Sequence, residues 1–148
     1  MNTKPIRLLL GRTDIVDFPK LNLEGIDIKV DTGAYTSSFH SHSIEVVDDI
    51  LKCQFLDPKH EKYHKKYFIF KDFTQKKVKS SNGIVETRFT IKTEILIFNK
   101  IEEIELTLTE RGSMKYPVLL GRKFLSKKFI VDTAKKNLSF KKLNTHTL

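Results

Sequence analysis

Asp31 stands in a run of residues that could do acid–base chemistry. It follows the apolar segment at 26–30 and is followed by Thr32, Gly33 and Ala34. A carboxylate at the tip of a buried strand is costly unless it is paired or used. Threonine and glycine directly after it allow a tight turn whose amides point back at the carboxylate. The pattern predicts that Asp31, Thr32 and Gly33 are catalytic.

Peptide hydrolysis that uses only carboxylates needs more than one of them. Two carboxylates that share one proton act as base and acid, because like charges about 3 Å apart cannot both ionise. This chain has one Asp-Thr-Gly, so we expect the second acid from Asp31 of another copy across a two-fold axis. Asp132-Thr133-Ala134 lacks the glycine, and we interpret it as the plain end of a strand.

A second apolar segment, Val118 to Leu120, ends in Gly121-Arg122 and is suited to brace the Asp31 loop from beneath. With β-rich sequence between them, the two motifs resemble those of retropepsins, the single-lobe aspartic proteases of retroviruses. The closer resemblance is to the bacterial retropepsin-like family that carries the label ATP-dependent zinc protease and is often encoded beside glutamate ligases. The matching segments are 9–12, 28–34, 36–40, 79–83, 86–88, 106–111 and 114–125.

The strand-like runs predict an all-β class, and the resemblance implies a closed retropepsin-like (acid protease) barrel. One short helix is expected after Gly121, at 122–127. Strands are expected at 6–10, 26–30, 67–70, 91–98, 101–108, 129–131 and 138–140. We expect one domain over 1–148, with an insertion of extra strands around 41–73.

A hairpin is predicted around 76–90, because Asn82-Gly83 between β-formers is a strong turn signal. The resemblance implies that this hairpin is a flap over the cleft, with Ser81, Asn82 and Gly83 contacting substrate. An ordinary surface hairpin is the alternative. The resemblance also implies that Thr32 bonds across the two-fold axis and that Gly33 and Ala34 offer backbone to the substrate.

Three arginines, Arg88, Arg111 and Arg122, match arginine positions of the family and are expected to bind substrate. Guanidinium forks bind carboxylates bidentately. The chain carries a formal net charge of +9, and family members are linked to trimming oligo-glutamate tails, so an acidic peptide is the expected substrate. The alternatives are ion pairing of these arginines with Glu86 or Glu110 and a lysine-rich composition without functional meaning.

One departure from the retroviral pattern concerns the residue after Ala34. Retroviral enzymes have an acid there that pairs with the arginine of the second motif. This chain has Tyr35, which leaves Arg122 without that partner. Arg122 is then expected to pair elsewhere or to bind an anionic substrate.

A rival site is His60-Glu61-Lys62-Tyr63-His64, which has the spacing of a zinc hydrolase helix. Its context favours strand over helix and no third ligand is evident, so we expect no metal. His40 and His42 are interpreted as satisfied polar groups or surface residues rather than ligands. Ser37 and Ser38 are interpreted as residues that hydrogen-bond near the Asp31 loop rather than as nucleophiles. No cofactor is expected, since the chain has no G-x-x-x-x-G-K-[ST] motif for ATP.

Composition limits the remaining choices. The single cysteine, Cys53, allows no intrachain disulfide and is interpreted as structural. No apolar run approaches the roughly 20 residues of a membrane span, and no secretory signal is evident, so a cytoplasmic protein is expected. The alternative function is a non-catalytic retropepsin-like module that binds an anionic partner. A nucleic acid is the less favoured partner.

Overall fold

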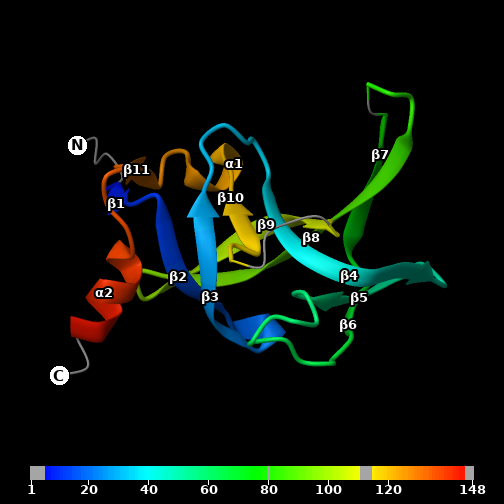
Figure 1. Cartoon of the computed structure of the whole chain (residues 1–148), viewed down its shortest axis with the longest axis horizontal. Helices are drawn as coiled ribbons and strands as arrows, with labels where there is room; N and C mark the ends of the chain where they lie inside the picture. The colour runs from blue at the N-terminus through cyan, green and yellow to red at the C-terminus, as the bar shows by residue number, and fades with distance from the viewer. Residues whose placement is uncertain (1–5, 80, 111–114, 146–148) are drawn as a thin grey trace, which may run out of the picture.

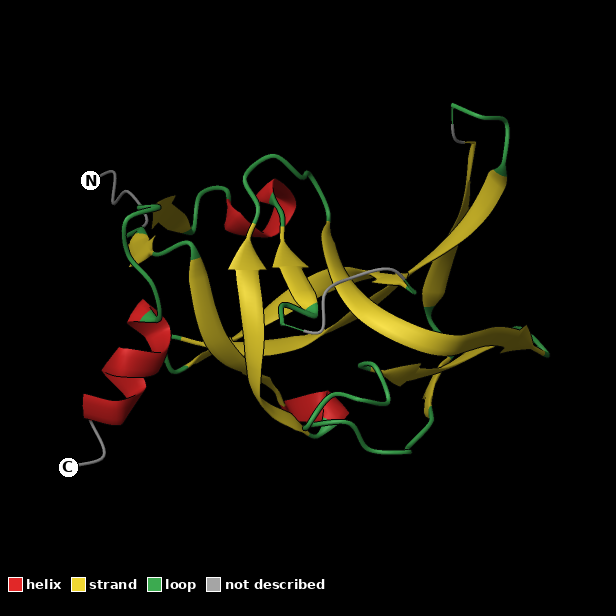
Figure 2. Ribbon diagram, viewed as in Figure 1, coloured by secondary structure: helices red, strands yellow, loops and turns green. Residues whose placement is uncertain are grey.

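The structure is a computed structural model that describes residues 6–79, 81–110 and 115–145. The described chain is mostly strand, with short helices at the periphery (Figures 1 and 2). The strands are β1 (Leu8–Leu10), β2 (Thr13–Phe18), β3 (Leu23–Val30), β4 (Ser37–Val47), β5 (Ile50–Phe55), β6 (Phe68–Phe70), β7 (Phe73–Lys79), β8 (Val85–Ile97), β9 (Lys100–Thr109), β10 (Val118–Leu120) and β11 (Phe129–Val131). The helices are η1 (Pro19–Leu21), α1 (Arg122–Leu125) and α2 (Leu138–Thr145).

Six strands close into a barrel in the order β10–β3–β2–β8–β9–β4, and β4 pairs back onto β10. Two of these pairings are parallel, β10 with β3 and β4 with β9. The predicted all-β retropepsin-like barrel is confirmed. Closure brings the end of β3 against the end of β10, so that the two motifs singled out in the sequence are neighbours.

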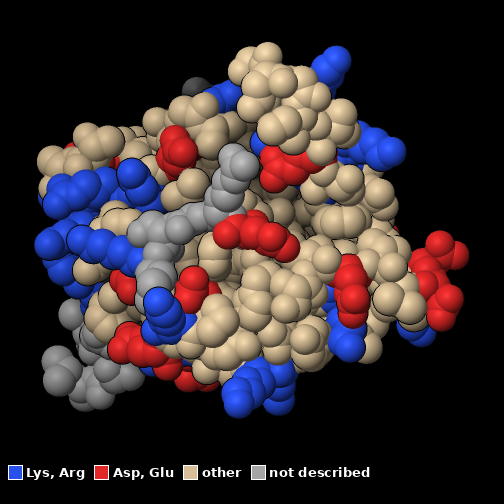
Figure 3. All heavy atoms as spheres, turned by 45° about the vertical axis from the view of Figure 1, so that its right-hand side comes forward, with Lys and Arg blue, Asp and Glu red and all other residues tan. Residues whose placement is uncertain are grey.

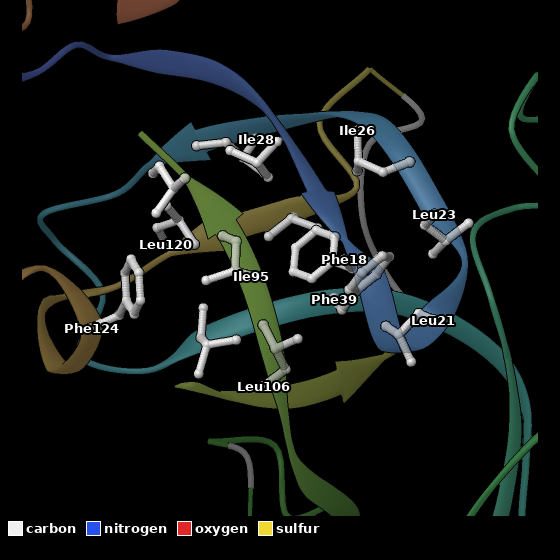
Figure 4. Packing of buried hydrophobic residues seen from close by; sticks show 14 of the residues in the cluster. Phe18, Leu21, Leu23, Ile26, Ile28, Phe39, Ile95, Leu106, Leu120 and Phe124 are labelled. Atoms are coloured by element: carbon white, nitrogen blue, oxygen red, sulfur yellow. The ribbon is translucent and has the colours of Figure 1, made fainter. Parts of the chain in front are cut away.

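The barrel interior is filled by alternating apolar side chains, which converge between the strands in Figure 4. Phe39 lies at its centre, with its ring 5.0 Å from that of Phe18 and 4.9 Å from that of Phe55. All three rings are fully buried. Tilted aromatic pairs at this spacing add to the area that they bury. The packed interior gives β3 and β10 a rigid support.

The predicted strand at 138–140 is wrong, because these residues begin helix α2. Asp14, in β2, is buried, and its two carboxylate oxygens accept the backbone N–H groups of Ser139 at 2.9 Å and Phe140 at 3.1 Å. The first amides of a helix have no partner inside the helix, and a carboxylate there satisfies them. The helix predicted after Gly121 is present as α1, so the chain has one α-helix more than expected.

The region around 41–73 contains the outer part of β4, then β5 and β6, which form a separate sheet edge. Its connection at 56–67 has no regular secondary structure. In Figure 1 this segment lies at the lower edge of the barrel, beneath β2 and β3. It is held there by the ring of His64, whose Nε2 is 3.3 Å from the carbonyl of Leu21.

Strands β7 and β8 form the hairpin that includes the predicted Asn82-Gly83 turn. Gly83 has φ +84°, a backbone conformation that glycine adopts without strain. In Figure 1 the hairpin projects at the upper right, apart from the loop that follows β3 at the upper centre. No helix among the described residues is long and apolar enough to cross a membrane.

Candidate active site

Asp31 stands at the end of β3, where its carboxylate is turned back onto its own loop. Its Oδ1 accepts the backbone N–H of Gly33 at 3.1 Å. Its own N–H donates to the carbonyl of Leu120 at 2.9 Å, and its carbonyl accepts the N–H of Ala34 at 3.2 Å. The side chain is partly exposed, and Thr32 and Gly33 are exposed. The arrangement fixes the carboxylate while leaving it accessible from outside.

Gly121 braces the far side of this loop. A Cβ on Gly121 would lie 2.5 Å from the carbonyl oxygen of Thr36 and 2.8 Å from that of Tyr35, so only glycine fits at this approach. Its N–H donates to the buried hydroxyl of Ser37 at 3.0 Å. This bond agrees with the interpretation of Ser37 as a residue that hydrogen-bonds near the Asp31 loop. Ser37 holds Gly121 against the loop.

Arg122 binds to the same loop, and its partner is not an acid. Its backbone N–H donates to the carbonyl of Ala34 at 2.9 Å, and its Nη1 donates to the carbonyl of Thr32 at 3.0 Å. The guanidinium also lies over the ring of Tyr35, 5.8 Å from the centroid. The aromatic ring therefore stands where the retroviral pattern has a carboxylate, and a cation–aromatic contact replaces the ion pair.

A second loop with the same construction follows β11, which corrects our interpretation of Asp132-Thr133-Ala134 as a plain strand end. Asp132 Oδ1 accepts the N–H of Ala134 at 2.9 Å, and its own N–H donates to the carbonyl of Leu10 at 2.9 Å. Arg12 donates from its backbone to the carbonyl of Lys135 at 2.8 Å and from Nη1 to that of Thr133 at 3.2 Å. Each bond has its counterpart around Asp31.

The sequence held a signal for this duplication. Leu9-Leu10-Gly11-Arg12 and Leu119-Leu120-Gly121-Arg122 are identical tetrapeptides. Each begins with the last two residues of a strand, β1 or β10, that runs parallel to a strand ending in valine and followed by Asp-Thr. The repeat was missed because its two halves interleave along the chain. The two loops are joined at Arg12, whose carbonyl accepts the N–H of Val30 at 2.9 Å. The second loop therefore supports the strand that carries Asp31.

The other predicted substrate-binding residues lie on the hairpin or outside the described chain. Ser81, Asn82 and Gly83 form its exposed turn. Arg88 lies on β8, with Nη2 3.8 Å from Glu86 Oε2, and both side chains are about half exposed. The ion pair expected as the alternative for Arg88 is thus present, although such exposed pairs contribute little. Arg111 lies outside the described residues.

Two hollows flank the strands at the base of the hairpin. One, of about 360 Å³, lies on the outer face of β9 and reaches Thr36, just beyond the Asp31 loop. Lys123 lines it, and the hydrogen bond and charge of Glu105 raise the pKa of Lys123. The other, of about 550 Å³, lies on the opposite face, where Phe89 and Leu108 pair. Asp31 lines neither hollow.

The His60–His64 segment is not helical, so the spacing does not place its two imidazoles on one face. His60 Nδ1 accepts the N–H of Lys62 at 3.0 Å, while the ring of His64 packs on Phe68 and contacts Leu21. Among the described residues, no cluster of three or more His, Cys, Asp or Glu side chains is placed to hold a metal ion.

Three buried imidazole nitrogens have no hydrogen-bond partner within the described structure, namely Nδ1 of His40, Nε2 of His42 and Nδ1 of His64. His40 Nε2 is 4.0 Å from Asp57 Oδ2, and the ring of His42 packs against Tyr63. His40 and His42 thus lie where β4 contacts the 56–67 segment, whereas His64 belongs to that segment and contacts Leu21. The predicted active-site loop lies elsewhere on the barrel.

Comparison with known proteins agrees with this geometry. The sequence model of the RimB-like family, described as retropepsin-like aspartic endopeptidase RimB, matches residues 9–142. Two curated relatives are a probable alpha-L-glutamate ligase of Shewanella halifaxensis, 34% identical over 130 residues, and one of Desulfotalea psychrophila, 30% identical over 146 residues. Each match covers 85% of this chain but only 28% of the relative, so the chain spans less than a third of their length.

The fold has a counterpart among solved structures. The crystal structure of Lpg0085, a protein of unknown function (DUF785) from Legionella pneumophila, superposes with a TM-score of 0.70 at 25% sequence identity. The match covers 90% of this chain and 99% of that one. The barrel with its additional strands is therefore shared over nearly the whole of both chains.

Proposed function

Because the chain belongs to the RimB-like family of retropepsin-like aspartic endopeptidases, we propose that it is an aspartic peptidase whose reacting group is Asp31. The observation that carries the proposal is the loop at the end of β3. There an accessible carboxylate is fixed by the N–H of Gly33 at 3.1 Å and braced from behind by Gly121. A preorganised acid of this kind is what peptide hydrolysis by carboxylates needs.

The reaction requires a second carboxylate, which we assign to Asp31 of a second copy in a homodimer. The internal alternative, Asp132, is held in a loop of its own beside β1. With one proton shared by the pair, the ionised carboxylate takes a proton from water while the other protonates the carbonyl oxygen of the scissile bond. The water oxygen bonds to the carbonyl carbon. The carbon–nitrogen bond then breaks as the nitrogen receives the proton that was taken from water, and a hydroxyl of the tetrahedral intermediate returns its proton to the other carboxylate.

The turn formed by Ser81, Asn82 and Gly83 is proposed to close over a peptide bound against Thr32, Gly33 and Ala34. Its support is the hairpin itself, whose base borders the hollow that reaches Thr36. In the open arrangement of Figure 1 this turn stands clear of the Asp31 loop. The cleft would then be complete only with substrate and partner present.

An acidic peptide, such as an oligo-glutamate tail, is the proposed substrate. The formal net charge of +9 favours it, but Figure 3 shows acidic side chains scattered across the face in view and basic ones around its rim, most densely at the left edge. Bulk charge is therefore weaker support than a local cation. Of the predicted arginines, Arg122 contacts the Asp31 loop directly, and Arg88 is paired with Glu86.

The test compares two variants that change the same chemical group in two similarly built loops. Asp31→Asn removes the proposed reacting carboxylate, and Asp132→Asn is the matched control. We expect Asp31→Asn to lower peptide hydrolysis by at least about 100-fold, the lower range for loss of a general acid–base group, with the melting temperature retained. Asp132→Asn should keep most of the activity. Wild-type turnover by Asp31→Asn would refute the proposal.

A second candidate is a non-catalytic module that acts together with a glutamate ligase. It is favoured by the curated relatives, which are named probable alpha-L-glutamate ligases and contain this region as 28% of their length. The discriminating assay adds the purified chain to a glutamate ligase and measures glutamate addition. An effect on the ligase that Asp31→Asn leaves unchanged would support this candidate over the peptidase.

A further inference from the structure

Tyr35 is a large aromatic side chain left 59% exposed at the edge of the proposed active site. It follows Ala34 directly and has the guanidinium of Arg122 over its ring, 5.8 Å from the centroid. The backbone carbonyl of Tyr35 also accepts the N–H of Lys123 at 2.8 Å. The ring is thus fixed at its base by α1, and its face is occupied by the neighbouring cation.

Arg122 is fixed on two sides and open on the rest. Its Nη1 donates to the carbonyl of Thr32, and its Cζ lies over the ring of Tyr35, 5.8 Å from the centroid. Within the described part of the chain, no carboxylate oxygen lies within ion-pair distance of its guanidinium. A guanidinium carries five N–H donors, so the bond to Thr32 leaves donors for a ligand. Arg122 therefore presents a cation without a paired carboxylate, held on the Asp31 loop.

The duplicated loop shows that this arrangement is not required by the fold. Arg12 makes the same bonds around Asp132, from its backbone to Lys135 and from Nη1 to Thr133. The residue equivalent to Tyr35 in that loop is Lys136. An aromatic support for the arginine is a feature of the Asp31 loop alone in this pair. A structural brace would need the bonds but not the ring.

We propose that Arg122, held in place by Tyr35, binds a glutamate side chain of the substrate next to the scissile bond. Arg122 determines specificity and Tyr35 is its positioning residue. The next residue in the chain, Lys123, is bound to Glu105 Oε2 at 2.5 Å and is not available for the same carboxylate. The inference deepens the proposed function and rests on it for the position of the scissile bond, but its central claim concerns binding alone.

The experiment measures peptide binding without turnover, in an Asp31→Asn background. The inference about Arg122 can therefore be tested even if the peptidase proposal fails. Fluorescence anisotropy gives the Kd of two labelled peptides of equal length, one rich in glutamate and one in glutamine. We expect Arg122→Gln to raise the Kd of the glutamate-rich peptide at least about tenfold, because a charge-assisted hydrogen bond is lost. Arg12→Gln is the matched control and should change neither Kd.

Variants of Tyr35 test the support. Tyr35→Phe keeps the ring and should leave both Kd values unchanged. Tyr35→Leu should raise the Kd of the glutamate-rich peptide about two- to fivefold. Tyr35→Asp places a carboxylate beside Arg122 and should raise this Kd as much as Arg122→Gln does. Equal binding of both peptides by the starting protein would overturn the inference. So would a loss in Tyr35→Leu that is the same for both peptides and accompanied by dissociation of a dimer.

Discussion

Asp14 is the buried carboxylate that caps helix α2, and its removal should strongly lower the stability of the fold. It is 1% exposed, and its oxygens accept the N–H groups of Ser139 at 2.9 Å and Phe140 at 3.1 Å. The hydroxyl of Ser139 in turn accepts the N–H of Phe98 at 2.7 Å. Asp14→Ala leaves two helix amides without their acceptor. Loss of a cap costs about 0.5–2 kcal/mol and a buried unpaired donor about 1–3 kcal/mol.

We therefore expect Asp14→Ala to lower the free energy of unfolding by about 3 kcal/mol. For a domain of this size that corresponds to a fall in melting temperature of roughly 6–12 °C. Urea unfolding followed by circular dichroism measures the loss in the free energy of unfolding and the dependence of this free energy on urea concentration. A loss below about 0.5 kcal/mol, with α2 still formed, would refute the assignment of Asp14 as the cap.

The same carboxylate makes stability depend on pH. Burial raises the pKa of Asp14, although its backbone hydrogen bonds to Ser139, Ile15 and Phe140 lower it in part. Between the ordinary pKa near 3.9 and the raised value, the folded chain binds a proton that the unfolded chain has released. Stability should therefore fall as the pH rises through this window. Burial also raises the pKa of Asp27, so the wild type must be compared with Asp14→Asn.

Asp14→Asn removes the titration while keeping an oxygen that can accept one helix N–H. Its free energy of unfolding should fall less steeply than that of the wild type as the pH rises from the ordinary aspartate pKa, near 3.9, through the raised pKa of Asp14. Parallel curves for the two proteins across this range would show that Asp14 does not titrate as inferred. The cap assignment would then rest on Asp14→Ala alone.

The remaining predictions concern the active-site loop and the rival metal motif. Gly121→Ala should destabilise the chain by about 2–4 kcal/mol in thermal unfolding, because its Cβ would lie 2.5 Å from the carbonyl oxygen of Thr36. Gly33→Ala should instead lower kcat with little change in melting temperature, since its Cβ would meet only Asp31 Oδ1, at 3.3 Å. Removal of metal with a chelator, and then addition of zinc, should both leave hydrolysis unchanged, because the segment around His60 is not a helix. Activity that is lost on chelation and restored by zinc would contradict this prediction.

The barrel could be predicted from sequence because its strands alternate and its motifs occur in a recognisable order. Its closure could not. The parallel pairings of β10 with β3 and of β4 with β9 join segments far apart in the chain, and nothing local specifies their register. The resemblance supplied the closed form. It carried no information about the loop around Asp132, because the retroviral pattern offers no comparison for it.

The error at 138–140 has a physical cause that local reading could not reach. Leu138-Ser139-Phe140 is a short apolar run, and periodicity does not separate strand from helix over three residues. What decides the outcome is Asp14, 125 residues earlier in the chain. The partner of Arg122 was missed for a related reason. The retroviral pattern indicates an acid as the partner of Arg122, whereas Tyr35 offers a ring.

The two loops together show what Gly33 is for. Ala134 occupies the equivalent position beside Asp132, and its N–H makes the equivalent bond to the carboxylate at 2.9 Å. The loop can therefore be built with a Cβ at this position, and Gly33 does not have the positive φ that would demand glycine. A Cβ at Gly33 would stand 3.3 Å from Asp31 Oδ1. The absent methyl group leaves the carboxylate of Asp31 open to water, to a peptide and to a second carboxylate. Both carboxylates are partly exposed, so the difference between the loops lies in the methyl group beside the acid, which Ala134 has and Gly33 lacks.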